Sequence, residues 1–387
     1  AQAAKALVHT FYGRDPAYSY FSGVSDGGHE ALVLAQRYPE DFNGIIAGAP
    51  ANNWAPLLGL FEPWLAVMNR NAEGKQILTS EKLPALHAAV MAACADAHGV
   101  IQDPRACAFD PASMRCAAAE RPDCLTDEQI KMVREEYRGP HDAQGRNLFD
   151  GGEPYGSELA WSFWIVMPAA DAAAPGDAYA TLGINYLNDM AFWSNPAPGY
   201  TLATVPFTAE MHQRLQELGG VYGANTPDLE AFRANGGKII IYHSWEDQAI
   251  PPFATIDYYR AVANQMGGYE AIQSFSRLYM IPGLYHCPCG QPVDGDPATS
   301  VQLMPQLVNW VEHGQAPGDI VLPVTAQTAG ERLTELKVSP FDPSQPAPHN
   351  NGLNSNYDYI GASSDYQKRN ELWCSWDGPR LICSPRS

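Results

Sequence analysis

The sequence contains few basic residues and no long apolar run. Lys and Arg together number 24 against 43 Asp and Glu, so the formal net charge is −19 at pH 7. A surface this acidic repels nucleic-acid phosphates and anionic lipid, and no apolar run approaches the roughly 20 residues that cross a bilayer. We therefore expect neither a nucleic-acid partner nor a membrane partner.

Charged residues are also scarce, at 17%, whereas hydrophobic residues make up 45% of the 387 residues. This balance excludes a disordered chain and supplies enough apolar material for a core. The length allows two to three domains. We find neither a signal-peptide pattern nor an internal repeat in the printed sequence.

The eight cysteines form no C-x-x-C pair, so a zinc ribbon is excluded. Three pairs instead bracket short segments of a Pro- and Gly-rich chain: Cys94 with Cys107, Cys116 with Cys124, and Cys374 with Cys383. We interpret them as disulfides, which predicts an oxidising compartment and therefore a secreted or periplasmic protein. The alternative is a set of unpaired buried thiols.

The first fifty residues alternate between strand and helix patterns. Aromatic residues at 18–21 favour a short strand, and glycines punctuate residues 23–28. The apolar residues that follow suit a helix with one buried face, which ends before Pro39. The apolar run 42–50 predicts a buried strand. The expected order is strand, tight turn, helix, strand.

A long insertion then interrupts this rhythm. From Trp54 to about Phe232 the chain is helix-prone, irregular and rich in aromatic residues, with predicted helices at 83–94 and 126–137. After Gly236 the α/β rhythm returns, with predicted strands at 238–242 and 276–281 and predicted helices at 253–266 and 301–313. Beyond Leu322 the chain is rich in Pro, Asn and Ser, which makes it a poor source of strands.

The pentapeptide Gly23-Val24-Ser25-Asp26-Gly27 matches G-x-S-x-G. In α/β-hydrolases this motif holds a nucleophilic serine on a strained turn between strand and helix, where the flanking residues must be small. Ser25 is therefore the candidate nucleophile, and the backbone N–H of Asp26 is a candidate donor to the oxyanion hole. The alternative is an ordinary glycine-rich turn.

A serine nucleophile needs a base, and in this fold an acid and then a histidine follow it along the chain. Glu246 and Asp247 come just after the strand predicted at 238–242, and His286 follows the next strand. We therefore expect His286 as the base and one of the two carboxylates as the acid. Two other histidines fit less well: His243 lies within the acid loop, and His29 lies on the nucleophile helix, where we expect it to point away.

Longer stretches around these residues resemble the tannase and feruloyl esterase family, which also includes a hydrolase of mono(2-hydroxyethyl) terephthalate. The similar stretches are 20–32 (YFSGVSDGGHEAL), 36–51 (QRYPEDFNGIIAGAPA), 236–247 (GGKIIIYHSWED) and 283–287 (GLYHC). The resemblance covers most of residues 6–320. It implies an α/β-hydrolase fold, Asp247 rather than Glu246 as the acid, and hydrolysis of esters of aromatic acids.

Members of this family insert a large lid between the strand after the nucleophile helix and the strand before the acid. The resemblance therefore divides the chain into a catalytic core of residues 1–53 and 233–322, a mainly helical lid of residues 54–232, and a C-terminal extension of residues 323–387. The lid should hold the acyl ring. Its densest aromatic runs predict four substrate-binding residues: Trp161, Trp164, Phe192 and Trp193.

One departure from the family pattern concerns the triad. Family members usually have a cysteine before the nucleophile, bonded to the cysteine after the catalytic histidine. Here Val24 occupies the first position, so Cys287 lacks that partner. Two alternatives follow: the triad is held less rigidly than in the family, or Cys287 is bonded to Cys289, although a bridge across one residue is strained.

A second departure concerns the calcium loop that the family's lid often carries between two cysteines. In the corresponding segment of this chain only Asp96 and Asp103 remain, and His98 stands where an aspartate is expected. Calcium prefers six to eight oxygen ligands. We therefore expect no strong calcium site, and we predict no other metal or cofactor.

These observations predict a secreted serine carboxylesterase that works through an acyl-enzyme on a small aromatic ester. Galloyl, feruloyl and terephthaloyl esters are not separated by any residue pattern. A serine peptidase on the same fold and a non-catalytic binding protein on a hydrolase scaffold are the alternatives.

The predicted nucleophile strand begins early, because only seventeen residues precede Tyr18 and residues 4–12 can supply one helix. An α/β-hydrolase has several strands before this one, and the second oxyanion donor normally comes from a loop among them. We therefore expect an N-terminal segment, on a separate chain or in preceding sequence, that supplies the first strands and this donor. The alternative is a reduced sheet closed by the C-terminal tail.

Overall fold

The computed structural model describes residues 1–171, 177–286, 301–324 and 334–345, and the backbone of 372–377 and 380–385. At its centre is a parallel sheet of four strands in the order β1 (Tyr20–Val24), β2 (Gly44–Gly48), β3 (Lys238–Ser244) and β4 (Ser276–Ile281). Every residue of β2 and β4 is buried, as expected for strands that are covered on both faces. The predicted α/β class is therefore confirmed.

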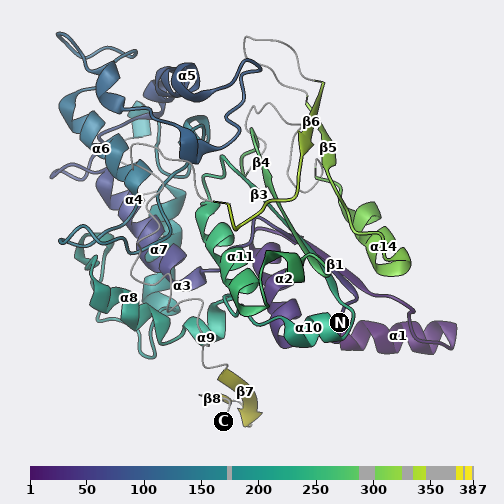
Figure 1. The fold of residues 1–387 in the computed structure, drawn as a ribbon. Coiled ribbons are helices and arrows are strands. Elements are labelled where there is room, and N and C mark those ends of the chain that lie inside the picture. Colours follow the sequence, from purple (N-terminus) through teal and green to yellow (C-terminus); the bar gives the residue numbers. More distant parts are fainter. Residues whose placement is uncertain (172–176, 287–300, 325–333, 346–371, 378–379, 386–387) are drawn as a thin grey trace.

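Helices cover both faces of this sheet (Figure 1). On one face, Ile45 and Ala47 of β2 pack with residues of four helices, which are α2 (Asp26–Arg37), α10 (Glu230–Ala234), α11 (Phe253–Gln265) and α12 (Tyr269–Ile272). On the other face, Ile46 packs with α14 (Met304–His313) and with the antiparallel hairpin of β5 (Ile320–Pro323) and β6 (Glu335–Val338). Alternate side chains of one strand thus join two separate cores.

The segment between β2 and β3 forms the second layer of helices, to the left of the sheet in Figure 1. We call residues 54–232 the insertion. Its helices are α3 (Trp54–Pro56), α4 (Glu62–Met68), α5 (Leu83–Cys94), α6 (Asp127–Arg138), α7 (Ala178–Asp189), α8 (Ala209–Gln216) and α9 (Gly219–Tyr222), and a π-helical turn spans Leu57–Phe61. Helix α5 has the predicted bounds, and α6 begins after a capping box of Thr126 and Gln129.

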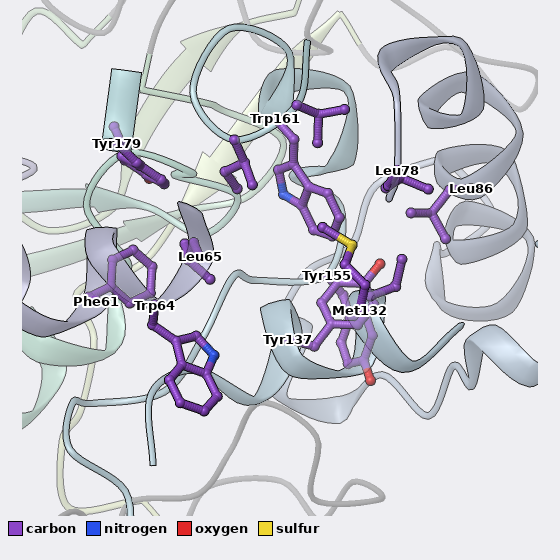
Figure 2. Packing of buried hydrophobic residues seen from close by; sticks show 14 of the residues in the cluster. Phe61, Trp64, Leu65, Leu78, Leu86, Met132, Tyr137, Tyr155, Trp161 and Tyr179 are labelled. Carbon is purple, nitrogen blue, oxygen red and sulfur yellow. The ribbon is translucent and has the colours of Figure 1, made fainter. Parts of the chain in front are cut away.

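Aromatic residues fill the core of the insertion. Figure 2 shows Phe61 and Trp64 on one side of this core and Tyr137, Tyr155 and Trp161 on the other. The same cluster includes Ala249, Ile250 and Ala254, which follow β3 in the chain. The insertion therefore packs directly on the loop that carries the candidate acid.

The C-terminal tail contains strands, although we expected its composition to make it a poor source of them. Besides β6, it forms an antiparallel hairpin of β7 (Leu372–Asp377) and β8 (Arg380–Pro385). In the described part of the chain, neither hairpin pairs with the parallel sheet, where β1 is an edge strand. Helix α1 (Gln2–Tyr12) precedes β1 and exposes Leu7, Phe11 and Tyr12.

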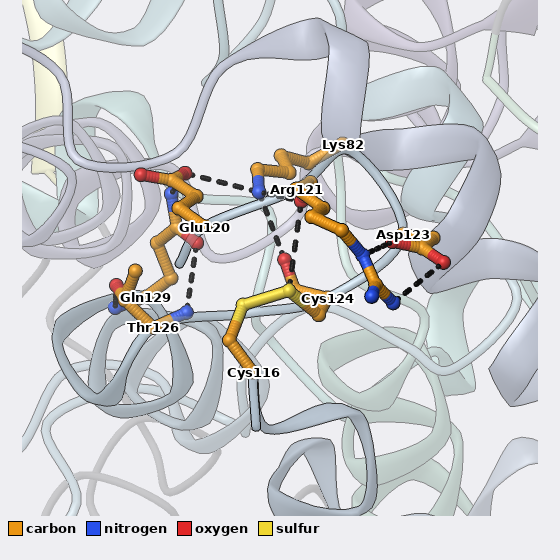
Figure 3. Close-up of a disulfide and its surroundings, with 8 residues drawn as sticks. All are labelled: Lys82, Cys116, Glu120, Arg121, Asp123, Cys124, Thr126 and Gln129. Carbon is orange, nitrogen blue, oxygen red and sulfur yellow. Dashed lines mark hydrogen bonds and ion pairs between the residues drawn. A yellow bond between two sulfur atoms is a disulfide. The ribbon is translucent and has the colours of Figure 1, made fainter. Parts of the chain in front are cut away.

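Two of the three predicted disulfides are confirmed, namely Cys94–Cys107 and Cys116–Cys124. Figure 3 shows the second of them beside Lys82, whose ammonium donates to the carbonyl oxygens of Arg121 and Cys124. Cys374 and Cys383 face each other in the register of β7 and β8, but their side chains lie outside the described residues, as do Cys287 and Cys289.

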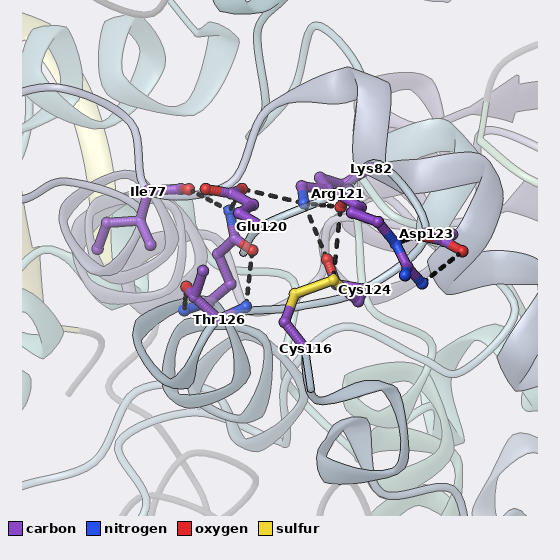
Figure 4. A network of polar contacts seen from close by, with 9 residues as sticks. Ile77, Lys82, Cys116, Glu120, Arg121, Asp123, Cys124 and Thr126 are labelled. Carbon is purple, nitrogen blue, oxygen red and sulfur yellow. Dashed lines mark hydrogen bonds and ion pairs between the residues drawn. A yellow bond between two sulfur atoms is a disulfide. The ribbon is translucent and has the colours of Figure 1, made fainter. Parts of the chain in front are cut away.

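A polar network extends from this disulfide (Figure 4). Glu120 pairs with Lys82 at 3.0 Å and accepts from Gln129 at 2.9 Å, so the loop closed by the disulfide is tied to α6.

Removing the Cys116–Cys124 bridge with the double substitution Cys116→Ser and Cys124→Ser should free this loop in the unfolded chain. We expect the free energy of unfolding to fall by about 2–3 kcal/mol. Urea denaturation measures the change, and non-reducing peptide mapping of the unmodified protein checks the pairing; free thiols at these positions would contradict the compartment we predict.

Candidate active site

The turn between β1 and α2 holds Ser25 in a backbone conformation that residues other than glycine rarely adopt, with φ 66° and ψ −120°. A Cβ on Gly23 would lie 2.2 Å from the carbonyl oxygen of Gly27, and a Cβ on Gly28 would lie 2.2 Å from that of Gly48. Only glycine therefore allows the turn to close and α2 to approach β2. Of the two motif glycines, Gly23 is therefore a steric requirement of this turn, whereas a Cβ on Gly27 would meet no atom within 4 Å.

The loops after β3 and β4 bring the other two predicted residues to this turn. The Nε2 atom of His286 lies 2.9 Å from the Oγ atom of Ser25, and its Nδ1 atom lies 2.8 Å from Oδ2 of Asp247. With a carboxylate beside Nδ1, that nitrogen carries the proton and Nε2 accepts from the serine hydroxyl. The three side chains thus form one continuous chain of hydrogen bonds.

Asp247 is fully buried, and both of its carboxylate oxygens accept hydrogen bonds. Oδ1 accepts from the backbone N–H groups of Ala249 and Ile250, at 2.9 and 2.8 Å. Burial opposes ionisation, but the charge of His286 and the hydrogen bonds from His243 and His286 outweigh it and hold the pKa of Asp247 well below its usual range. The side chain is therefore a carboxylate across the neutral pH range.

Glu246, the rival acid, occupies a different place. Its Oε2 atom accepts from the backbone N–H of Leu284 at 3.1 Å, and none of its hydrogen bonds to the described residues involves the ring of His286. Burial raises the pKa of Glu246 well above its usual range, although backbone hydrogen bonds from Gly283 and Leu284 oppose that rise. This side chain connects the two loops that carry the candidate acid and base.

The two competing histidines have other contacts. His243 is buried, with Nδ1 2.8 Å from Oγ1 of Thr255 and Nε2 2.8 Å from the carbonyl oxygen of Ile250. Its Nε2 atom also lies 3.4 Å from Oδ2 of Asp247, so it holds the acid loop closed. His29 binds the carbonyl oxygen of Tyr222 and stacks on Trp54, facing the insertion.

The insertion also reaches the acid and base loops. The hydroxyl of Tyr179, on α7, donates to the carbonyl oxygen of Gln248, and the side-chain oxygen of Gln248 accepts from the backbone N–H of His286 at 3.2 Å. The ring of Trp164 stands edge-on to the ring of His286, with 6.2 Å between centroids. Sequence reasoning missed Gln248 and Tyr179, because neither residue type nor spacing signals a contact between distant loops.

The four predicted substrate-binding residues have different surroundings. Trp164 is the one whose ring meets the ring of His286. Trp161 has 0% of its surface exposed and donates its indole N–H to Ser157, so it belongs to the insertion core. Phe192 packs under the guanidinium of Arg214, and Trp193 is 64% exposed. We keep Trp164 as a candidate and interpret Trp161 as a packing residue.

The backbone N–H of Asp26 begins α2, where the first-turn donors have no acceptor within the helix. It lies next to Ser25 in the chain, so it remains the candidate oxyanion donor.

In the shortened calcium loop, Asp96 accepts from the backbone of His98 and Val100, and Asp103 pairs with Arg105. Among the described residues, no group of three or more His, Cys, Asp or Glu side chains could hold a metal ion. No helix in the described ranges is long and apolar enough to span a bilayer.

Glu136 of α6 is a buried carboxyl group whose two oxygens find no hydrogen-bond partner among the described residues. Burial raises its pKa well above the usual range, and the nearby charges of Glu153 and Asp177 raise it further. The folded state therefore keeps this proton, whereas the unfolded chain releases it above about pH 4.3. Stability should fall as pH rises from there toward the folded-state pKa, by up to about 1.4 kcal/mol per pH unit.

We expect Glu136→Gln to reduce this loss. The melting temperature of the variant should drop less than that of the unmodified protein between pH 5 and pH 8, since Gln is neutral in both states. Glu128→Gln, at an exposed position of the same helix, is the matched control and should follow the unmodified protein. Parallel pH dependence in all three proteins would show that Glu136 is ionised in the fold.

Comparison with known proteins identifies the family of this chain. The family described as tannase and feruloyl esterase matches residues 1–358. The chain belongs to this family. It is 34% identical over 352 residues to an uncharacterized esterase of Xanthomonas campestris pv. campestris, and 30% identical over 370 residues to the mono(2-hydroxyethyl) terephthalate hydrolase of Piscinibacter sakaiensis. Each match covers 82% of this chain, and 60% and 59% of the relatives.

A solved structure of the family shares the fold. The crystal structure of feruloyl esterase B from Aspergillus oryzae superposes with a TM-score of 0.73 at 24% identity, over 88% of this chain and 68% of that one. The chain thus spans about 60% of the length of the curated relatives it matches. The expected N-terminal segment and the four-part division of the chain stay predictions.

Proposed function

We propose that this protein hydrolyses esters of aromatic acids, with Ser25 as nucleophile, His286 as general base and Asp247 as the acid that orients the base. The observation that carries the proposal is the continuous hydrogen-bond chain from Ser25 Oγ through the His286 ring to Asp247 Oδ2. It is built on the strained turn that this family of folds uses for a serine nucleophile. Membership of the tannase and feruloyl esterase family supports the choice of reaction.

Each residue has a defined part in the reaction. Nε2 of His286 removes the proton from Ser25 as its Oγ attacks the ester carbonyl, and the developing oxyanion accepts a hydrogen bond from the N–H of Asp26. The same nitrogen then gives the proton to the departing alcohol, which leaves an acyl group on Ser25. Water, activated by His286, attacks that acyl group and releases the acid.

The insertion acts as a lid in this proposal. Trp164 lies beside the base and supplies an aromatic surface at the site. Among the relatives are a mono(2-hydroxyethyl) terephthalate hydrolase and a probable feruloyl esterase. Two disulfides in the insertion favour an oxidising compartment, and we propose that the protein is secreted or periplasmic.

A panel of substrates tests the proposal. Methyl ferulate, methyl gallate and a terephthalate monoester are compared side by side, with methyl butyrate as the aliphatic control and casein for peptidase activity. We expect at least one aromatic ester to be hydrolysed with kcat/KM ten or more times that of methyl butyrate. Release of casein peptides without ester hydrolysis would replace this function with proteolysis, and inactivity on every substrate would favour a binding protein.

A further inference from the structure

Phe163 has an unusual backbone for a bulky residue. Its φ is 75°, in the left-handed region that favours glycine, and 61% of its surface is exposed. Among the described residues, only Ser25 and Ala49 are other non-glycine residues with positive φ. Such a conformation costs about 1–3 kcal/mol, and an exposed ring recovers little of that cost through burial. Stability alone therefore does not explain a phenylalanine at this position.

The surrounding chain fixes this conformation. The backbone N–H of Phe163 donates to the carbonyl oxygen of Val166 at 3.0 Å, and its carbonyl oxygen accepts from the N–H of Ala178, the first residue of α7, at 2.9 Å. Bonds on both sides of the residue hold the backbone, and the backbone holds the ring outward. Strained residues that are fixed in this way gather at functional sites.

The ring of Phe163 is connected to the candidate catalytic site through Trp164. It stands edge-on to Trp164 with 5.8 Å between centroids, and Trp164 stands edge-on to His286 with 6.2 Å between centroids. The base gives its proton to the departing alcohol, so the groups around its ring border the alcohol half of an ester rather than the acyl half. Phe163 therefore extends the aromatic surface that Trp164 presents beside the base.

We propose that Phe163 forms, with Trp164, a subsite for the alcohol half of the substrate, and that it favours alcohols with a flat apolar ring. This inference rests on the proposed ester hydrolysis by Ser25 and His286. A ring that stacks against or meets the edge of an aromatic side chain gains attraction beyond its buried area. A methyl or ethyl alcohol cannot reach this surface and gains nothing from it.

The test varies the alcohol while the acid is constant. Benzyl ferulate and methyl ferulate are compared in the unmodified protein and in Phe163→Gly, which accepts a φ of 75° without strain. We expect the ratio of kcat/KM for benzyl over methyl ester to fall three- to tenfold in the variant, while the melting temperature does not fall. Phe163→Tyr keeps the ring and should keep the ratio. Phe11→Ala, which removes an exposed ring from α1, is the matched control and should also keep it.

A second series varies the acid while the alcohol is constant, with methyl ferulate against methyl butyrate. The proposal is overturned if Phe163→Gly changes this ratio rather than the benzyl ratio, because the residue would then border the acyl half. It is also overturned if neither ratio changes, or if all rates fall equally together with the melting temperature. Absence of hydrolysis in the unmodified protein would instead refute the proposed function, so the two failures are distinguishable.

Discussion

Ser25→Ala is expected to lower kcat/KM for the best aromatic ester by roughly five to six orders of magnitude and to leave the fold intact. The variant lacks the hydroxyl that His286 contacts, whereas the turn itself depends on the close approach of Gly23 to Gly27. Alanine has the same Cβ as serine, so the positive φ of residue 25 costs the same in both proteins. Initial rates with purified protein and a thermal melt followed by circular dichroism measure the two parts of this prediction.

Ser22→Ala is the matched control for this variant, because Ser22 is an exposed serine on the same strand, β1. It should retain full activity and an unchanged melting temperature. If Ser25→Ala retained a tenth of the activity or more, another residue would be the nucleophile. A large fall in its melting temperature would mean that the serine hydroxyl supports the turn. The loss of activity would then not identify Ser25 as the nucleophile.

Local patterns in the sequence were enough to find the turn and the elements of the sheet. The strand β4 has the predicted bounds. The strand β3 begins where predicted and ends two residues later. The strand β1 begins two residues later than predicted and continues into the motif. The hydrophobic repeats of strands and helices span a few residues of sequence. The steric requirement at Gly23 involves Gly27, only four residues further along the chain. Such signals are readable in a single chain. Chain order then selected Ser25 and His286 but left Glu246 and Asp247 open as the acid, and the family resemblance selected Asp247. In the structure the ring of His286 lies within hydrogen-bond distance of both Ser25 and Asp247.

Contacts between segments distant in the sequence could not be predicted from local patterns. Aromatic density predicted Trp161 as a substrate residue, but apolar side chains at such density most often fill a core, and this one does. The link from Tyr179 through Gln248 to the base depends on how the insertion packs on the core, for which no local pattern exists. In the C-terminal tail, β7 pairs with the antiparallel β8. Amino-acid composition alone does not predict such pairing, because strand formation depends on the neighbouring strand.

The choice between Asp247 and Glu246 as the acid gives the second large effect. Asp247→Asn is expected to lower kcat about 10⁴-fold. The side-chain oxygen of the introduced asparagine would stay on the N–H groups of Ala249 and Ile250, which leaves its amide group facing Nδ1 of His286. Two donors cannot face each other, so the ring would take the tautomer with the proton on Nε2. That nitrogen could then no longer accept the proton of Ser25.

Glu246→Gln is the matched comparison, since it makes the same change of a carboxyl group to an amide one residue away. Burial raises the pKa of Glu246, which favours its neutral form, and Gln retains an oxygen that can accept from the N–H of Leu284. We expect kcat to fall less than tenfold. Steady-state kinetics on one aromatic ester compare the two variants, and circular dichroism shows whether each retains the fold.

The ratio of the two effects decides the assignment. A loss in Glu246→Gln that equals or exceeds the loss in Asp247→Asn would identify Glu246 as the acid and would mean that the loop after β3 rearranges when substrate binds. Similar small losses in both would mean that His243, which lies 3.4 Å from Oδ2 of Asp247, and the backbone donors hold the acid loop well enough without the charge. A loss of about a thousandfold or more confined to Asp247→Asn would support the acid role, because that carboxylate holds the proton on Nδ1 of His286.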